Sequence, residues 1–299
     1  MSFPDLGSGL PLVLDGGLAT ELETRGHDLS DHLWSARLLA DDPHEIVAVH
    51  RAFYRAGAVI ATTASYQASF EGFVARGISR AETTRLLQSS VRLADKARSE
   101  LADDGVARWV AASVGPYGAA LADGSEYRGR YGLRVAELTA WHRPRLEAIV
   151  EAGPDSLALE TVPDLDEGEA LMAAIAGFGV SAWLSYSIDR GRTRAGQPLA
   201  EAFEVTVGVP EIVAVGVNCC APSDVPEAVA IAREVTGKPV VVYPNSGEEW
   251  NSVRQSWAGP SRYSAEDARM WVSAGARIIG GCCRVAPSDI STLKRMLAN

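Results

Sequence analysis

Short runs of hydrophobic residues recur along the chain of 299 residues, and longer segments with helical spacing separate them. The runs are continuous rather than alternating, which is typical of parallel strands that are covered on both faces. We therefore predict a strand at each of these runs. The predicted strands are Leu12–Asp15, Ala58–Thr62, Trp109–Val114, Ser156–Glu160, Ala182–Ser187, Ile212–Asn218, Pro239–Tyr243 and Ala276–Ile279.

The segments between these runs carry the repeat of amphipathic helices. In Pro43–Ala56, Ile46, Val47, Phe53 and Tyr54 recur at spacings that place hydrophobic side chains on one helix face. Several segments begin with Pro, Ser, Asp or Glu, which are favoured in the first turn of a helix. The other predicted helices are Ala81–Leu101, Thr139–Glu151, Glu167–Ala176, Pro226–Val235, Ser264–Ser273 and Ser288–Leu297.

Strands and helices that alternate in this way are typical of an α/β protein, and eight strands predict a single (β/α)8 TIM barrel. A doubly wound open sheet shares the alternation but usually has fewer strands, and no Gly-x-Gly-x-x-Gly motif follows the first run. No low-complexity linker interrupts the chain, so residues 1–299 are expected to form one barrel domain. The connection from Tyr117 to Arg134 is expected to be a loop over the active face.

Polar residues, thiols and glycines follow several predicted strands. In TIM barrels the active site lies at the carboxyl ends of the strands, so these residues are expected to meet at one rim. A single polar strand end is explained by solvent, but many such ends in one chain favour a site. The residues that we single out are Asp15, Gly16 and Gly17 after the first strand, Glu160 in the fourth, Cys219 and Cys220 after the sixth, and Cys282 and Cys283 after the eighth.

The composition is that of a globular protein, with 47% hydrophobic and 22% charged residues. The 28 Lys and Arg residues face 38 Asp and Glu residues, and the formal net charge of −10 argues against a nucleic-acid partner. Residues 1–14 contain no Lys or Arg, so no secretory signal is predicted. No hydrophobic run is long enough to span a membrane. We expect a soluble, cytoplasmic protein without a membrane or nucleic-acid partner.

The four cysteines form two adjacent pairs, at the ends of the sixth and eighth predicted strands. Disulfide frameworks are denser in cysteine, so four reduced thiols are expected. Three thiolates at one barrel mouth would suit a zinc ion that keeps one position open, while the alternative is that the cysteines are small buried hydrophobic residues. None of the five histidines ends a predicted strand, and His142 is expected on a helix surface.

Asp15 and Glu160 are single carboxylates at their strand ends. They could form an acid/base pair, bind an ammonium group or pair with a buried arginine; without a histidine nearby, ammonium binding is favoured. The backbone N–H groups of Gly16 and Gly17 could receive a carboxylate. These features together suggest an amino-acid site beside a metal that binds thiols. Three arginines after the fifth strand are expected to lie in a solvated loop: Arg190, Arg192 and Arg194.

Several segments resemble the zinc-dependent homocysteine S-methyltransferases, and the resemblance covers almost the whole chain. Two of them are the most specific: Gly216-Val-Asn-Cys219 and Gly280-Gly-Cys-Cys-Arg284. The Trp34-Ser-Ala36 and Tyr243–Glu248 segments are more similar to the branch of the family that uses S-methylmethionine or S-adenosylmethionine than to the betaine-using branch. The other similar segments are Asp15–Glu23, Ser65–Ala68, Ser113–Gly118, Gly124–Gly129 and Glu160-Thr161.

The resemblance implies a catalytic zinc ion bound by Cys219, Cys282 and Cys283. Cys220 comes just after the family's ligand position, so it is expected to be packed and receives no metal role. The resemblance also implies that Asp15 and Glu160 hold the amino group of homocysteine and that Gly16 and Gly17 lie where its carboxylate is received. Four aromatic residues are candidates for contact with a cationic donor, although each could equally pack in the core or a loop: Trp34, Tyr66, Tyr117 and Tyr127.

The implied reaction is methyl transfer from a sulfonium donor, S-methylmethionine or S-adenosylmethionine, to homocysteine, which gives methionine. Alternatives within the family are a betaine-dependent enzyme and a selenocysteine methyltransferase. A metal-dependent barrel hydrolase or lyase is another enzyme alternative, and a zinc or thiol redox sensor is the non-enzyme alternative. Homocysteine and a sulfonium donor are therefore the expected partners.

Overall fold

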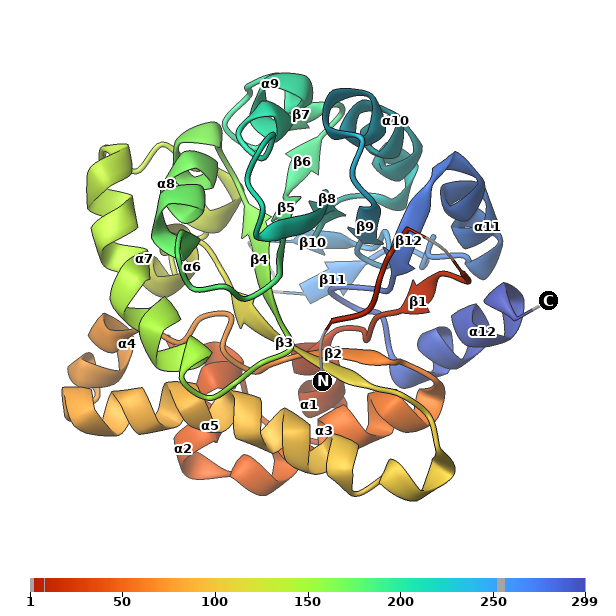
Figure 1. Ribbon diagram of the computed structural model, residues 1–299. Helices are drawn as coiled ribbons and strands as arrows, with labels where there is room; N and C mark the ends of the chain where they lie inside the picture. Colours follow the sequence, from red (N-terminus) through yellow and green to blue (C-terminus); the bar gives the residue numbers. More distant parts are fainter. Residues whose placement is uncertain (1–2, 8, 252–255, 299) are drawn as a thin grey trace.

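Eight parallel strands form a barrel that is surrounded by helices in the computed structural model, which describes residues 3–7, 9–251 and 256–298 (Figure 1). The strands follow one another around the sheet in the order β1-β12-β9-β8-β5-β4-β3-β2. Their bounds are β1 Leu12–Val13, β2 Ile60–Thr62, β3 Trp109–Val114, β4 Ser156–Val162, β5 Ala182–Tyr186, β8 Ile212–Asn218, β9 Val240–Tyr243 and β12 Ala276–Ile279.

The sheet closes on itself between β1 and β2. Leu14 forms a parallel bridge with Ile60, and the amide of Val59 donates a hydrogen bond to the carbonyl of Val13 at 2.8 Å. An open sheet would leave these backbone groups without partners, so closure removes both edges. The predicted (β/α)8 barrel is confirmed, and the open-sheet alternative is wrong.

Amphipathic helices cover the outside of the barrel (Figure 1). In α5, for example, Ser79 caps the first turn by accepting a hydrogen bond from the amide of Glu82, and Leu86, Leu87 and Val91 are buried against the sheet. All seven predicted helices are present with small shifts at their ends. They are α3 Pro43–Ala56, α5 Arg80–Ser99, α7 Val135–Val150, α8 Leu165–Ile175, α10 Val225–Thr236, α11 Ala265–Ala274 and α12 Pro287–Leu297.

The interior of the barrel is packed with side chains from every strand. Trp183 on β5 and Tyr243 on β9 are the large residues of this layer, and the Trp183 Nε1–H donates a hydrogen bond to the Tyr243 hydroxyl at 3.0 Å. Ala111, Ala158 and Ala214 leave the space that these two rings fill. Large and small residues therefore complement each other across the barrel, which is a filled core and not a channel.

Several short elements are absent from the sequence prediction. The connection after β3, expected to be only a loop, contains helix α6 (Tyr117–Leu121) and the 3-10 turn η3 (Ser125–Tyr127). Such elements are too short for a helical repeat to be recognised, and neighbouring structure stabilises them. The others are α1 Leu18–Thr24, η1 Trp34–Arg37, α2 Leu38–Asp41, α4 Phe70–Ala75, η2 Ala102–Asp104, α9 Leu199–Glu204, η4 Pro222–Asp224 and the strand pairs β6 Ile188–Asp189 with β7 Arg192–Thr193 and β10 Glu249–Asn251 with β11 Ser256–Ala258.

His142 is buried, so the prediction that it lies on a helix surface is wrong. Its ring and the Glu167 carboxylate are both fully buried, and Nε2 lies 2.9 Å from Oε1. Glu167 also accepts hydrogen bonds from the amide of Tyr117 and the hydroxyl of Tyr131. Burial lowers the pKa of His142 and raises that of Glu167 to about 7. The pair anchors the connection after β3 to helices α7 and α8.

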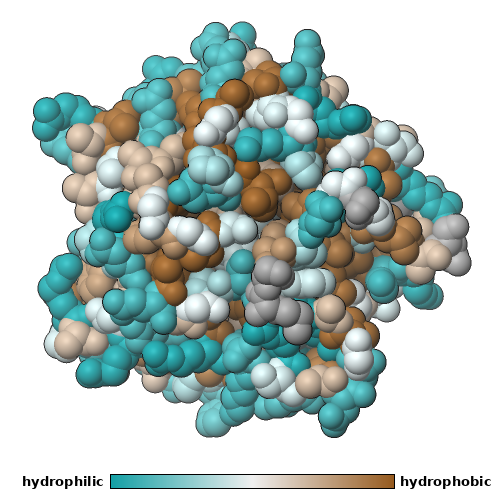
Figure 2. Space-filling model, viewed as in Figure 1, coloured by the Kyte–Doolittle hydropathy of each residue, from teal (hydrophilic) through white to brown (hydrophobic). Residues whose placement is uncertain are grey.

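Hydrophilic side chains cover much of the face shown in Figure 2, and hydrophobic ones gather nearer its centre. The amphipathic helices explain this distribution, because they turn their polar faces outward. Within the described residues, no helix is both long and hydrophobic enough to cross a membrane.

Candidate metal and substrate site

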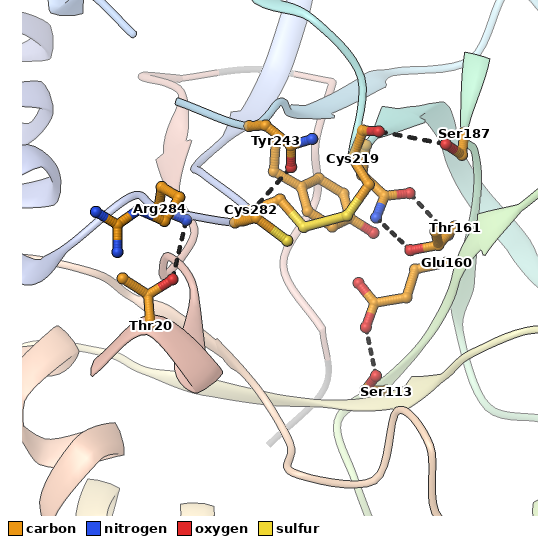
Figure 3. Close-up of a disulfide and its surroundings, with 12 residues drawn as sticks. Thr20, Ser113, Glu160, Thr161, Ser187, Cys219, Tyr243, Cys282 and Arg284 are labelled. Atoms are coloured by element: carbon orange, nitrogen blue, oxygen red, sulfur yellow. Dashed lines mark hydrogen bonds between the residues drawn. A yellow bond between two sulfur atoms is a disulfide. The ribbon is translucent and has the colours of Figure 1, made fainter. Parts of the chain in front are cut away.

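Three cysteines from two strand ends meet at the carboxyl end of the barrel. Cys219 follows β8, and Cys282 and Cys283 follow β12, 63 residues further along the chain. Their three sulfur atoms all lie within 4.8 Å of one another (Figure 3 shows Cys219 and Cys282). The three cysteines are thus placed so that they could hold one metal ion.

Backbone contacts with neighbouring loops hold the cysteine doublet in place. The amide of Cys282 donates to the carbonyl of Pro244 at 2.8 Å, and the amide of Cys283 donates to Asn245 Oδ1 at 3.2 Å. On the other side, a Cβ atom added to Gly17 would lie 2.6 Å from the carbonyl oxygen of Cys282. The loop after β1 can approach the doublet this closely only because glycine has no side chain.

The structure contains a disulfide between Cys219 and Cys282, whereas Cys220 and Cys283 are free. The expectation of four reduced thiols is therefore wrong for this structure. It fails because strand ends far apart in the sequence bring two sulfurs into bonding distance, with the Cα atoms 5.7 Å apart. A sulfur in a disulfide has no thiolate to offer, so metal binding by all three cysteines requires reduction. Cys220 is fully buried, as expected.

The backbone is strained next to the site. Thr161, Cys219 and Arg284 have φ values of 58°, 48° and 66°, which residues with side chains rarely adopt. Asn218 stabilises the first of these positions: its Oδ1 accepts from the amide of Thr161, and its Nδ2 donates to Thr161 Oγ1, both at 2.7 Å. Thr20 stabilises another by accepting a hydrogen bond from the amide of Arg284 at 2.9 Å. Such strain is typical of functional sites.

Asp15 lies at the end of β1 and is almost fully buried. One carboxylate oxygen accepts from the amide of Thr62 at 2.8 Å, and the other accepts from the Thr62 hydroxyl at 3.0 Å. Burial raises the pKa of Asp15 well above its usual value; the Thr62 hydrogen bonds lower it, and the negative charge of Glu160 adds to the rise. No described Lys, Arg or His side chain forms an ion pair with Asp15.

Glu160 lies near the end of β4 and is drawn with the disulfide in Figure 3. Its carboxylate accepts hydrogen bonds from the hydroxyls of Ser113 and Tyr243. Burial nevertheless raises the pKa of Glu160 to about 7. Asp15 and Glu160 are thus two buried carboxylates, and the charge of Glu160 adds to the rise in the pKa of Asp15, so a cation that contacted both would stabilise them.

The two glycines after Asp15 differ in their hydrogen bonding. The amide of Gly17 donates to the carbonyl of Val285 at 2.9 Å, so it is not free to receive a substrate carboxylate. The expectation that both amides are presented is therefore wrong for Gly17. The amide of Gly16 has no acceptor among the described residues.

Arg194 also lies at the site, which sequence reasoning missed. Its Nε donates to Ser187 Oγ at 3.0 Å, its Nη2 donates to the carbonyl of Cys219 at 3.2 Å, and its guanidinium carbon lies 5.6 Å from the centre of the Tyr127 ring. The prediction of a solvated arginine loop is confirmed for Arg190 and Arg192, which are exposed, and is wrong for Arg194. No pattern in the sequence distinguishes the three arginines.

This geometry defines a class of protein: a TIM barrel with a thiol cluster and buried carboxylates at its carboxyl end. A family model described as homocysteine S-methyltransferase matches residues 12–297. A homocysteine S-methyltransferase of Escherichia coli K12 is 47% identical over 291 residues, which cover 95% of this chain and 94% of that protein. The homocysteine S-methyltransferase YbgG of Bacillus subtilis 168 is 44% identical over 293 residues, 94% of this chain and 93% of that protein. The chain belongs to the homocysteine S-methyltransferase family and is a methyltransferase.

Solved structures agree with this assignment. The metallated form of the homocysteine methyltransferase MmuM from Escherichia coli superposes with a TM-score of 0.87 at 45% identity, covering 97% of both chains. Its oxidized form superposes with a TM-score of 0.86 at 46% identity, covering 95% of both chains. MmuM has therefore been solved both with metal and in an oxidized state.

Proposed function

We propose that the chain transfers a methyl group from a sulfonium donor, S-methylmethionine or S-adenosylmethionine, to homocysteine, with a zinc ion held by Cys219, Cys282 and Cys283. The observation that carries this proposal is the meeting of three sulfurs at the barrel mouth. Family membership supports homocysteine as the acceptor and a methyl donor as the second substrate.

The donor set fits zinc. Zinc binds thiolates at about 2.3 Å in tetrahedral sites, and ligand sulfurs in such a site are separated by less than the 4.8 Å that encloses the three cysteines. Catalytic zinc sites use three protein ligands and leave the fourth position for substrate. Zinc binds thiolate ligands readily, whereas the hard cations magnesium and calcium prefer oxygen ligands.

When bound, zinc would supply the chemistry of thiol activation, because a coordinating thiol is deprotonated at neutral pH. A free alkyl thiol has a pKa of about 8.5 and is mostly protonated, whereas the thiolate is the nucleophile. The proton of the homocysteine thiol goes to solvent, so no general base is needed. A sulfur–carbon bond then forms to the methyl group while the donor's sulfonium–methyl bond breaks, and both products are neutral at sulfur.

The carboxylates of the chain position the acceptor. Asp15 and Glu160 would hold the ammonium group of homocysteine between them, and the free amide of Gly16 would receive its carboxylate. Thr62, Ser113 and Tyr243 fix the two acidic side chains by hydrogen bonds. Such fixed placement increases the rate because the acceptor is already oriented for reaction when the donor binds.

Methionine formation from homocysteine tests the proposal. The reduced protein is assayed with S-methylmethionine, S-adenosylmethionine and betaine offered separately, before and after metal chelation and again after zinc is restored. We expect turnover with a sulfonium donor that chelation abolishes and zinc restores. Turnover with betaine alone, or full activity after complete metal removal, would overturn the proposal.

A further inference from the structure

The connection after β3 carries Glu126, an acidic residue with no role in the proposed reaction. Helix α6 and the turn η3 pack so closely that a Cβ atom added to Gly118 would lie 2.5 Å from the amide nitrogen of Glu126. The turn is also fixed by a hydrogen bond from the Gly129 amide to the Ser125 carbonyl at 2.9 Å. Glu126 is therefore held in place by its neighbours.

One oxygen of the Glu126 carboxylate lacks a partner. Its Oε2 atom is buried and has no hydrogen bond, and Glu126 forms no ion pair with a basic side chain among the described residues. Glu126 is partly buried, and a buried oxygen without a partner is unfavourable. Burial raises the pKa of Glu126. A buried polar atom that has no hydrogen-bond partner within the protein can bind a ligand instead.

The surroundings of Glu126 suit a cation. Tyr127 follows Glu126 in η3, and its ring lies under the guanidinium of Arg194, which donates to the carbonyl of Cys219, so the turn lies beside the sulfur cluster. Burial raises the pKa of Tyr66, and the negative charge of Glu126 adds to that rise. The Tyr127 side chain is 43% exposed and can therefore contact a substrate. Tyr66 packs edge-on against Trp34, with ring centres 6.1 Å apart. Aromatic faces and a carboxylate are the groups that bind sulfonium and ammonium cations.

Arg194 does not neutralise this carboxylate. Its guanidinium donates to Ser187 and to the Cys219 carbonyl, and the described residues contain no ion pair between Arg194 and Glu126. Arg194 lies over the ring of Tyr127 and so helps to hold that ring. The negative charge of Glu126 remains available to a bound molecule.

We propose that Glu126, with the rings of Tyr66 and Tyr127, binds the positive charge of the donor's sulfonium group. This inference rests on the proposed function. It also has a mechanistic consequence: methyl transfer removes the positive charge from the donor, so Glu126 binds the donor more tightly than the neutral thioether that remains. The residue thus favours donor binding and product release, and it contributes more to KM than to kcat.

The test compares wild type with Glu126→Gln, using S-methylmethionine and dimethylsulfonioacetate as donors. The second compound has a sulfonium group but no ammonium group. We expect KM to rise about 10- to 100-fold for both donors, as for loss of a charged contact, with a smaller change in kcat and an unchanged KM for homocysteine. An increase for S-methylmethionine alone would assign Glu126 to the ammonium group and overturn the inference, as would no change for either donor.

Asp123→Asn is the matched control, because Asp123 is exposed in the same loop and its side chain accepts a hydrogen bond from the Ser125 amide that asparagine can keep. It removes the same charge and should leave both KM values unchanged. Glu126→Asp, which keeps the charge, should recover part of the affinity, and thermal unfolding shows whether each variant is folded. If wild type uses no sulfonium donor, the proposed function fails; if wild type does and Glu126→Gln behaves identically, only this inference fails.

Discussion

The environment of Cys283 at the barrel mouth determines the reactivity of its thiol. Cys283 is free and partly buried, and burial raises the pKa of its thiol to about 11. Without a metal this thiol stays protonated at neutral pH, so it is a poor nucleophile. The Cys283 thiol by itself therefore has low reactivity toward a substrate.

Cys283→Ser tests the role of this residue as a ligand. We expect the reduced variant to bind zinc at least about 100-fold more weakly than wild type, because changes even to residues behind a ligand cost 10- to 100-fold in metal affinity. Metal analysis after dialysis against a competing chelator measures this. Cys220→Ala is the matched control, since Cys220 is adjacent to Cys219, fully buried and outside the sulfur cluster. Full zinc content in Cys283→Ser would remove Cys283 from the site.

The raised pKa of Glu160 predicts a pH-dependent affinity for the amino-acid end of the acceptor. Homoserine, which has a hydroxyl in place of the thiol, isolates this effect by calorimetry. The folded-state pKa is about 7, so below pH 7 binding of the ammonium group must displace a proton from Glu160. Affinity should fall about tenfold per pH unit between pH 7 and 5 and level off above pH 7.

Glu160→Gln should bind homoserine more weakly and lose this step near pH 7. Because the pKa of Asp15 is also raised, a residual slope in the variant would belong to Asp15. Equal affinity of wild type at pH 5 and pH 8 would contradict the assignment of Glu160 to the ammonium group.

At the scale of elements, the site depends on close contact between the loop after β1 and the loop after β12. Gly17→Ala would place a Cβ atom 2.6 Å from the Cys282 carbonyl oxygen and push the doublet away from Cys219. We expect weaker zinc binding and a decrease of about 1–3 kcal/mol in the free energy of unfolding. Both are measurable by metal competition and urea denaturation.

Gly105→Ala provides the comparison for this variant. Gly105 has a φ of 70° with open space around its Cα, so alanine there strains the backbone without touching the site. It should lower stability and leave zinc affinity unchanged. A loss of zinc affinity in both variants would show that Gly17 acts only through general stability.

The sequence predicted the strands well because each parallel strand is buried on both faces and reads as a continuous hydrophobic run. β3, β8 and β12 have the predicted bounds. Short helices such as α1 and α9 were missed because six or seven residues carry too little periodicity. They form because they pack on the barrel, and this packing depends on the tertiary structure and not on the local sequence pattern.

The site was predicted in part. Cysteines and carboxylates at strand ends were recognisable, since the fold brings those ends together. Their partners were not: Thr62 contacts Asp15, and Ser113 contacts Glu160, in each case across 47 residues of chain. The positive φ of Cys219 and the disulfide to Cys282 likewise follow from loop geometry that no local pattern encodes.

For the whole molecule, the filled barrel interior connects stability to the site. Trp183 donates to the Tyr243 hydroxyl, which also hydrogen-bonds with Glu160, so the packed layer extends up to the candidate substrate pocket. Trp183→Ala should lower the free energy of unfolding by about 3–5 kcal/mol, as for other buried large-to-small changes. Urea denaturation measures this. Trp183→Phe keeps most of the volume and should cost less; an equal loss in both variants would place the effect in the hydrogen bond and not in packing.

The oxidation state of Cys219 and Cys282 determines whether the protein can bind zinc through all three cysteines. Since Cys219 and Cys282 form a disulfide, the protein in this state cannot present three thiolates. Zinc uptake should therefore require prior reduction, and titration of oxidised and reduced protein with zinc would show this. Equal uptake by both forms would exclude Cys219 and Cys282 as ligands.

X-ray absorption spectroscopy at the zinc edge tests the central claim most directly. The reduced, zinc-loaded protein is measured alone and after addition of homocysteine. We expect three sulfur neighbours at about 2.3 Å in the first case and four in the second. A first shell dominated by nitrogen and oxygen, or one that homocysteine leaves unchanged, would contradict the account.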